Sequence, residues 1–339
     1  MKLKLFIGTM LAVLLTVSVW VLWQQSHAKP RTIAAQLNQV RTGASQSSPI
    51  PINAGRMVPV VGLAESSSLV TPYSGQDNWT AVNLIVDERA DFEHRLLASD
   101  VLAKHLSEAD WDELRKFLLM PAPLDQSPYG QTVKNRLMDA LCAMNPLPDG
   151  LGEVLSKIYH DPHQDGVIRD YAVQHLTPYY EQLATQPDSN QELAAAKAVL
   201  WEAIKEPGGS VQGTALLALK RLSQEFTDFN QAEITTTATQ LASDPTTGEL
   251  THITALQVCA QLGVDNALPV ALQAAQAGET IPVKISAIGA LGQLGGTEQI
   301  PFLQGVVQGT DDRLKPAAQH SLEQIAARQN QNNGRKQTL

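Results

Sequence analysis

Cysteine is scarce in this sequence, which contains only two such residues, Cys142 and Cys259. They lie 117 positions apart and form no Cys-x-x-Cys pair, the spacing that zinc sites and redox pairs use. Each falls on the apolar side of a helical pattern, where a thiol behaves as a small hydrophobic side chain. The scarcity argues against a disulfide framework, and we expect both thiols to be buried.

Aromatic residues and clusters of positive charge are also rare. Phe, Trp and Tyr make up 5% of the chain, whereas Ala, Leu and Gln recur throughout its second half, a balance that favours helices over a β-sandwich. The formal net charge is −9 and no long block of Lys or Arg occurs, although binding nucleic-acid phosphates requires such clusters. We therefore expect an all-α protein that does not bind nucleic acid.

Recognisable catalytic motifs are missing as well. The sequence contains no Gly-x-Ser-x-Gly, His-Glu-x-x-His or Walker motif. Gly289, Gly292, Gly295 and Gly296 resemble a dinucleotide-binding loop, but no strand pattern precedes them. Close helix packing and a helix C-cap explain these glycines better. We predict a protein that is not an enzyme and that holds no cofactor.

The densest group of potential metal ligands lies in one short segment. His160, Asp161, His163 and Asp165 occur within six residues, so a divalent-ion site is one interpretation. Aspartate also caps helices, and a proline and a helix start flank the segment. We favour an inter-repeat turn in which Asp161 and Asp165 are capping residues, and we predict no metal.

The N-terminus carries the only long hydrophobic run. Residues 5–23 are uncharged and follow Lys2 and Lys4, and their 19 positions approach the roughly 20 that span a bilayer. We predict that residues 1–28 form a single-pass anchor in a cell inner membrane, with the bulk of the chain in the periplasm or its equivalent. The alternative is a signal peptide cleaved after the small-residue site at 26–28, which would give a secreted protein.

Two segments outside the helical pattern are predicted to lack a packed core. Residues 29–83 hold repeated prolines and serine groups without a sustained helical period, which indicates a flexible linker or stalk. Residues 329–339 are rich in Asn and Gln and indicate a disordered tail. Between them, residues 84–328 show apolar positions at helical spacing, broken by Pro, Gly or Asp every 15 or so residues.

The helical region contains internal repeats. Residues 255–263 align with 287–295 at an offset of 32, and their apolar positions coincide. The same offset aligns residues 267–270 with 299–302, so that a second helix starts at Pro269 in one unit and at Pro301 in the next. Proline suits the first turn of a helix, where its missing N–H is not needed. The unit is therefore predicted to be a helical hairpin.

Five units can be aligned in this way, and weaker candidates near residues 101–119 and 136–158 raise the number to six or seven. Residues 283–295 read Val-Lys-Ile-Ser-Ala-Ile-Gly-Ala-Leu-Gly-Gln-Leu-Gly. This segment resembles the HEAT repeat, specifically the short bacterial type related to bilin lyases. The resemblance is specific for the last three units and weakens towards the N-terminus. It implies an all-α, right-handed α-solenoid of helical hairpins, placed behind the transmembrane helix and the flexible stalk.

A row of mostly basic residues lies three positions before the small anchor residue of each unit: Arg169, Gln212, His252, Lys284 and Lys315. The resemblance implies that this row is structural, each member bridging to an acidic loop residue of a neighbouring repeat, with Asp165, Asp244 and Asp312 as expected partners. The alternative is that the row lines the concave face and contacts a partner.

A stack of hairpins offers an extended surface rather than a closed pocket, and such surfaces suit polypeptide partners. We therefore expect a noncatalytic scaffold or adaptor that binds one or more protein partners and is tethered to the membrane by its N-terminal helix. Two alternatives stay open. One is a HEAT-like lyase or small-ligand-handling protein with a site in the concave groove, and the other is a self-associating structural protein of the envelope.

Overall fold

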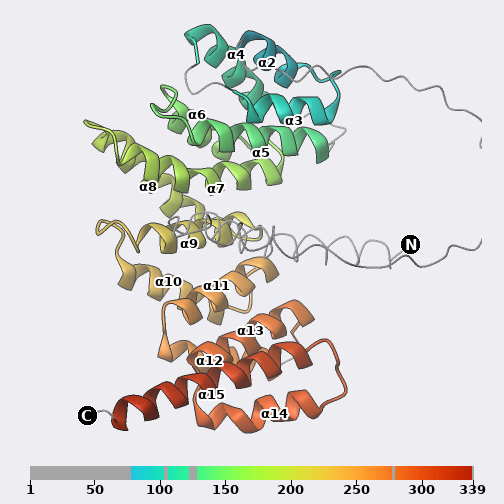
Figure 1. Cartoon of the computed structure of the whole chain (residues 1–339), viewed down its shortest axis with the longest axis vertical. Helices are drawn as coiled ribbons and strands as arrows, with labels where there is room; N and C mark the ends of the chain where they lie inside the picture. Colours follow the sequence, from blue (N-terminus) through green and yellow to red (C-terminus); the bar gives the residue numbers. More distant parts are fainter. Residues whose placement is uncertain (1–77, 103–105, 122–127, 277–278, 338–339) are drawn as a thin grey trace, which may run out of the picture. The chain divides into compact units, whose positions relative to one another are not determined.

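A computed structural model describes residues 78–102, 106–121, 128–276 and 279–337 of the 339-residue chain (Figure 1). In this part the chain forms α-helices and two short 3-10 helices, η2 (Asp265–Ala267) and η3 (Thr297–Gln299), and no strand. The α-helices are α2 (Asn78–Val86), α3 (Phe92–Asp100), α4 (Glu108–Leu119), α5 (Pro128–Cys142), α6 (Leu151–His160), α7 (Gly166–Leu183), α8 (Asn190–Ala203), α9 (Val211–Leu222), α10 (Gln231–Ser243), α11 (Glu249–Gln261), α12 (Leu268–Gln276), α13 (Ile281–Leu294), α14 (Ile300–Gln308) and α15 (Lys315–Gln337).

The helices pack in two rows. Each odd-numbered helix from α3 to α13 packs against the next odd-numbered helix, and α2, α4, α6 and α8 pack in succession in the other row, as α10 does with α12. Within the stack, consecutive even and odd helices form hairpins, such as α6 with α7 and α12 with α13. The predicted all-α stack of helical hairpins is confirmed, whereas the right-handed superhelix stays a prediction.

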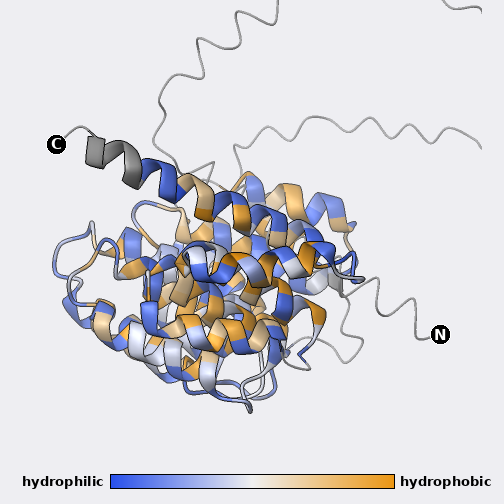
Figure 2. Cartoon of the chain, turned by 90° about the horizontal axis from the view of Figure 1, so that it is seen from below, coloured by the Kyte–Doolittle hydropathy of each residue, from blue (hydrophilic) through white to orange (hydrophobic). Residues whose placement is uncertain are grey.

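The core lies between the rows and is built by the repeated small and large aliphatic positions. The small anchors have no exposed surface in five successive odd-numbered helices: Ala172, Ala215, Ala255, Ala287 and Ala318. One helical turn later, Leu176, Leu219 and Leu291 are equally buried, and each such leucine contributes about 2 kcal/mol to folding. Figure 2 shows the apolar turns gathered towards the interior and the hydrophilic ones on the outside. The aligned pattern in the sequence is therefore the pattern of the core.

The helix boundaries follow local capping chemistry. Asp165 accepts a hydrogen bond from the Val167 N–H at the start of α7, and Pro269 and Pro301 lie at the second positions of α12 and α14, as predicted. The pairing of the helices differs from the sequence alignment in one respect. The helices that carry the small anchors close their own hairpins, and the proline-led helices open the next ones.

Two predicted boundaries are wrong. The linker does not extend to residue 83, because α2 begins at Asn78 and buries Ala81, Val82 and Ile85. No proline or glycine lies within α2, so nothing there interrupts a helix. The C-terminal tail is not disordered from residue 329, because α15 continues to Gln337 and Arg328 donates a hydrogen bond to the carbonyl of Gly295.

The predicted membrane anchor, residues 1–28, and most of the predicted linker lie outside the described residues. Among the helices that are described, none combines the length and the hydropathy needed to cross a bilayer. The anchor therefore stays a prediction based on the sequence of residues 5–23.

Candidate functional site: a buried polar row and an uncharged outer surface

The predicted row of polar residues meets the C-terminal ends of the even-numbered helices. The Arg169 Nε atom donates to the carbonyl of Tyr159 in α6 at 2.7 Å, and the Gln212 amide donates to the carbonyl of Ile204 after α8 at 2.8 Å. Carbonyls at a helix C-terminus lack intrahelical partners, and a donor there satisfies them. At these two positions the row holds the two helices of a hairpin together.

The same arrangement occurs in the first two hairpins, where sequence analysis missed it. Arg95 donates to the carbonyl of Ile85 at 2.9 Å, and Lys134 donates to the carbonyls of Leu118, at 3.1 Å, and Met120. Both cations also lie over the ring of Phe117. Burial lowers the pKa of Lys134 to about 8, and the charge of Glu88 offsets only part of the lost solvation. A long donor shortly after each helix start was the signal that could have revealed these two residues.

The carboxylate partners of the row differ from the prediction. Arg169 forms a two-pronged pair with Glu206 at 2.9 and 2.8 Å, rather than with Asp165. Asp165 caps α7 and accepts from Gln131, and Asp244 accepts from Thr246. Asp165 therefore links the start of α7 to α5, whereas Asp244 is occupied within its own turn, and neither carboxylate pairs with a residue of the row.

In the last hairpins the residues of the row make different contacts from those of Arg169 and Gln212. Lys315 pairs with Asp312 at 2.7 Å, but Asp312 is 87% exposed and lies in the same turn, so this pair does not join two repeats. His252 is buried, and its Nε2 atom has no hydrogen-bond partner. Lys284 is half-buried and contributes, after Arg313, to lowering the pKa of Asp311 to about 2. The structure therefore gives a joining role to Arg169 and Gln212 but not to these three residues.

The weak metal candidates are engaged in other contacts. His160 approaches the carbonyl of Ser156 through Nδ1 and Glu202 through Nε2, and the Asp161 carboxylate accepts from the His163 N–H. Asp165 is the N-cap of α7. No three His, Cys, Asp or Glu side chains of the described residues are grouped so that they could hold a metal ion.

Both thiols are buried and free, as predicted. Burial raises the pKa of Cys142 far above its ordinary value and that of Cys259 to about 11, so neither is a thiolate at neutral pH. Of the four glycines in and after α13, Gly292 and Gly295 behave as predicted, whereas a β-carbon at Gly289 or Gly296 would meet nothing within 4 Å. A β-carbon at Gly292 would lie 2.5 Å from the Ser321 hydroxyl of α15, and Gly295 is the C-cap of α13.

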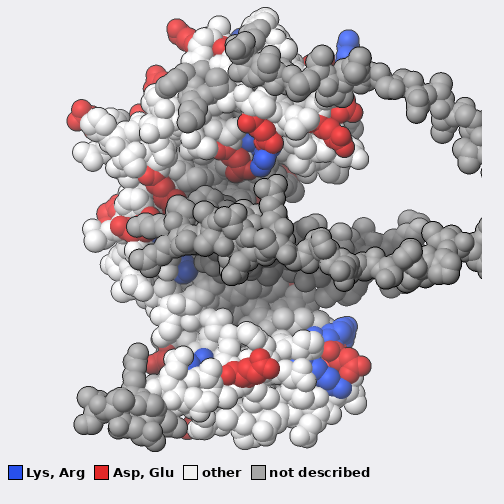
Figure 3. All heavy atoms as spheres, viewed as in Figure 1, with Lys and Arg blue, Asp and Glu red and all other residues white. Residues whose placement is uncertain are grey.

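The outer surfaces of the even-numbered helices fall into two parts. On α4 and α6 they carry exposed ion pairs within one helix, such as Arg115 with Asp112 and Lys157 with Glu153. Figure 3 shows acidic side chains on the hairpins nearer the N-terminus, and both acidic and basic ones on the last hairpins as well. On α10, α12 and α14 many exposed and half-buried positions carry no charge, although Glu233 in the first turn of α10 is exposed. Twelve of these uncharged positions form what we call the uncharged strip: Thr236, Thr239, Gln240 and Ser243, then Pro269, Leu272, Gln273 and Gln276, then Pro301, Gln304, Gly305 and Gln308.

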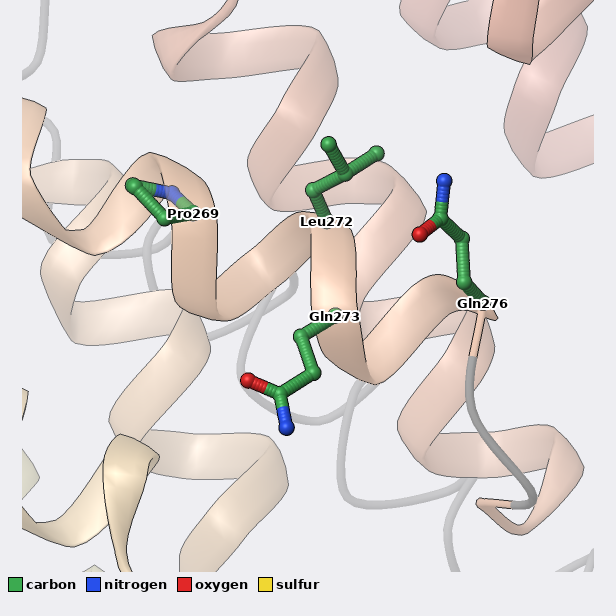
Figure 4. Close-up of a pocket in the computed structure, with 4 residues that line it drawn as sticks. All are labelled: Pro269, Leu272, Gln273 and Gln276. Atoms are coloured by element: carbon green, nitrogen blue, oxygen red, sulfur yellow. The ribbon is translucent and has the colours of Figure 1, made fainter.

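Two open hollows lie on the uncharged strip. One, of about 270 Å³, is lined by four hydroxyl residues and Gln240 of α10 and by Asn266 at the start of the next hairpin. The other, of about 420 Å³, is lined by Pro269, Leu272, Gln273 and Gln276, and Figure 4 shows that all four project from α12. Neither hollow presents a titratable group, so both suit binding rather than acid–base chemistry.

Comparison with known proteins shows no matching family model and no matching curated protein. Among solved structures, the chain is similar to human deoxyhypusine hydroxylase, with 14% identity over 75% of this chain and 97% of that one and a TM-score of 0.31. It is also similar to an engineered protein (17% identity, 73% and 96% covered, TM-score 0.36) and to yeast importin-β (12%, 73% and 35%, TM-score 0.43). Likeness at this level says nothing about activity, and the packing of the hairpins is what defines this chain as a helical-repeat protein.

Proposed function

We propose that this chain is a noncatalytic scaffold that binds a protein partner on the outer surface of its C-terminal hairpins. The observation that supports this most directly is the uncharged strip with its two open hollows. Solvent-facing helices ordinarily carry charges, as α4 and α6 do here, whereas the surfaces that proteins bury on association are depleted of charge.

The distribution of polar groups fits the same proposal. Arg169 and Gln212 are used to join helices, and the two thiols are buried. The side chains left available at the strip are amides, hydroxyls and aliphatic groups. Such groups contribute hydrogen bonds and contact area to a partner, and they supply neither a nucleophile activated by a base nor an acid.

We further propose that residues 5–23 tether the scaffold to the inner membrane with the hairpins outside the cytosol. The support for this is the apolar length of that run and the two lysines before it. Protease added to intact spheroplasts tests the topology. We expect digestion of the hairpins without detergent and retention of the chain in the membrane fraction after alkali washing.

The binding proposal is tested by crosslinking and affinity purification of the full-length chain from its native cells. The test variant, Gln273→Glu with Gln276→Glu, places two carboxylates on the exposed side of α12. The matched control, Ala195→Glu with Ala198→Glu, places two on the exposed side of α8. We expect one dominant protein with the wild type and the control, and its loss with the test variant.

Two results would contradict this proposal. If none of the three chains retains a protein, the chain is not a protein-binding scaffold. If all three retain the same protein equally, binding takes place away from the uncharged strip. Thermal unfolding of each variant, followed by circular dichroism, shows whether the hairpins remain folded.

A further inference from the structure

One ionisable side chain occupies a repeat position that is otherwise uncharged. This position directly follows the polar row, whose members include Arg95 and Lys134, and it faces the next odd-numbered helix. Asp170 of α7 contacts Ser210 at the start of α9, and a β-carbon at Gly213 of α9 would lie 3.1 Å from the Thr254 hydroxyl of α11. The residues at this position are Leu96, Asn135, Asp170, Gly213, Ile253, Ile285 and Pro316. Of these seven, Asp170 alone can carry a charge.

The Asp170 carboxylate is hydrogen-bonded on one side only. Its Oδ2 atom accepts from the Ser210 hydroxyl, whereas its Oδ1 atom is buried and has no hydrogen-bond partner. A buried oxygen without a donor costs more free energy when it belongs to a carboxylate than when it belongs to a neutral group. The equivalent residue of the preceding hairpin, Asn135, is such a neutral group, and its Oδ1 atom is also buried without a partner. The position therefore suits an uncharged acceptor better than a charged one.

The charges around Asp170 do not compensate its own charge. Arg169 is engaged with Glu206 and with the Tyr159 carbonyl, and Glu206 places a second negative charge near Asp170. Tyr171 is neutral, because burial raises the pKa of its hydroxyl. Other ionisable side chains on α7 and on the helices packed against it make contacts elsewhere: Asp139 with His175, Glu202 with His160, Glu192 with Tyr179, and Arg221 with Glu181.

These surroundings determine how Asp170 responds to pH. Burial raises the pKa of Asp170 above the ordinary 3.8, the hydroxyls of Ser210 and Thr214 oppose part of this rise, and the charge of Glu206 adds to it. The folded chain therefore still holds a proton on Asp170 at a pH at which the unfolded chain has released it. The contribution of Asp170 to stability consequently increases as the pH falls through this range, and it is lost as the pH rises again.

We propose that Asp170 is a proton-binding switch at the interface between α7 and α9, and that these helices pack more firmly when its carboxyl group is protonated. The proton removes the buried charge and gives the carboxyl group a donor for the Ser210 hydroxyl. Ser210 ends the loop that contains Gly208, whose φ of +87° suits glycine, and such a loop can absorb a change at the interface. Because each hairpin is stabilised by its neighbours, the switch controls how firmly the hairpins before α8 are held to those after α7.

The test is chemical unfolding of the full-length chain between pH 7 and pH 4, for the wild type and Asp170→Asn. The amide keeps the shape of the carboxyl group and does not titrate, so the titrations of all other groups cancel in the comparison. We expect the folding equilibrium constant of the wild type, relative to the variant, to rise at least about threefold as the pH falls from 7 to 4. The matched control is Asp149→Asn, which changes an exposed aspartate after α5 and is expected to show no such rise.

Hydrogen exchange shows where in the stack the switch acts. Exchange rates of wild-type amides are divided by those of Asp170→Asn at the same pH, so that the intrinsic pH dependence of exchange cancels. We expect this ratio to fall at least about threefold between pH 7 and pH 4 in α7 and α9, and to stay constant in α13. An equal change in α13 would overturn the assignment of the switch to the interface between α7 and α9.

Two further variants keep the proposal falsifiable if Asp170→Asn does not fold. Ser210→Ala removes the donor to Oδ2, so we expect the rise in stability on acidification to begin at a higher pH than in the wild type. Asn135→Asp places a carboxylate at the equivalent position of α5, and we expect it to add a second rise of the same sign. The inference is overturned if the comparison of wild type with Asp170→Asn does not change with pH or changes in the opposite direction. It is also overturned if neither further variant alters the pH dependence in the expected way.

Discussion

At the scale of single residues, the polar row requires a side chain that is long enough to bring a hydrogen-bond donor to the carbonyls of the preceding helix. A positive charge on that side chain is not required. Arg95, Lys134, Arg169 and Gln212 all donate to carbonyls at the end of the preceding helix, although one of them is neutral. Each bond satisfies an acceptor that the helix itself leaves open. Gln212, which departs from the basic pattern of the sequence, is therefore an equivalent member of the row.

This equivalence gives a prediction for Arg169. We expect Arg169→Ala to lower the free energy of unfolding by about 2 kcal/mol, because the Tyr159 carbonyl and the half-buried Glu206 both lose their donor. Arg169→Gln keeps a donor for the carbonyl, and we expect it to cost about half as much. Urea unfolding measures both. Stability equal to wild type in the alanine variant would contradict a joining role and favour a partner surface.

Two glycines of α13 form a matched pair for a second prediction. A β-carbon at Gly292 would collide with the Ser321 hydroxyl, whereas one at Gly289 would meet nothing within 4 Å. We expect Gly292→Ala to destabilise the chain by about 1–3 kcal/mol through overpacking between α13 and α15. Gly289→Ala is expected to stabilise it by up to about 1 kcal/mol, through helix propensity. Thermal unfolding distinguishes them, and equal effects would show that α15 does not approach α13 so closely.

The buried ammonium group of Lys134 predicts that the free energy of unfolding depends on pH. Its folded-state pKa of about 8 lies below the ordinary 10.5, so between these values the unfolded chain binds a proton that the folded chain has lost. The contribution of Lys134 to stability therefore rises with pH over that window, and below about 8 its burial opposes folding. Lys134→Met removes this titrating group. The titrations of all other groups then cancel in the difference between the unfolding free energies of wild type and variant.

The measurement is urea unfolding of wild type and Lys134→Met at several pH values between 7 and 10.5. We expect the free energy of the wild type, relative to the variant, to increase across this range. A difference that stays constant with pH would mean that Lys134 keeps its ordinary pKa and is therefore solvated in the folded chain.

At the scale of elements, the sequence predicted the hairpins best where small residues recur at a fixed offset. The helices α11 and α13 were aligned by Ala255 and Ala287, and both alanines are fully buried. The helix α2 was missed because it follows a proline-rich stretch and has only nine residues, too few to display a helical period. The extent of α15 was missed because polar composition alone does not distinguish a solvated helix from a disordered tail.

The corrected start of α2 gives a truncation experiment. A chain beginning at residue 78 retains the whole of α2, whereas one beginning at residue 84 loses the buried Ala81 and Val82. We expect the shorter chain to be less stable by about 2 kcal/mol, because the apolar surface between α2 and its neighbours is no longer buried. Chemical unfolding of the two chains measures the difference. Equal stability would restore the linker boundary at residue 83.

At the scale of the whole molecule, the contacts that define the site join residues far apart in the chain. Arg169 was expected to pair with a loop aspartate, but its partner Glu206 lies 37 positions away, and no sequence period marks that distance. The uncharged strip could have been predicted from the sequence, because its residues recur at the spacing of the repeats and none of them is charged. It was missed because sequence analysis looked for groups that are present in each repeat rather than for charges that are absent.

The stacking of hairpins also predicts which part of the molecule unfolds locally first. In a repeat array each unit is stabilised by its neighbours, so a terminal unit has fewer stabilising interfaces than a central one. Among the described residues, α9 packs against α7, α8, α10 and α11, whereas α3 packs against α2 and α5. Leu97 of α3 is 56% exposed, and Leu219 of α9 is fully buried. Hydrogen exchange of the full-length chain should therefore show faster exchange in α3 than in α9. Equal protection of the two helices would mean that the open side of α3 is covered, and the hairpin that α3 forms with α2 would then be an internal unit of the stack rather than its end.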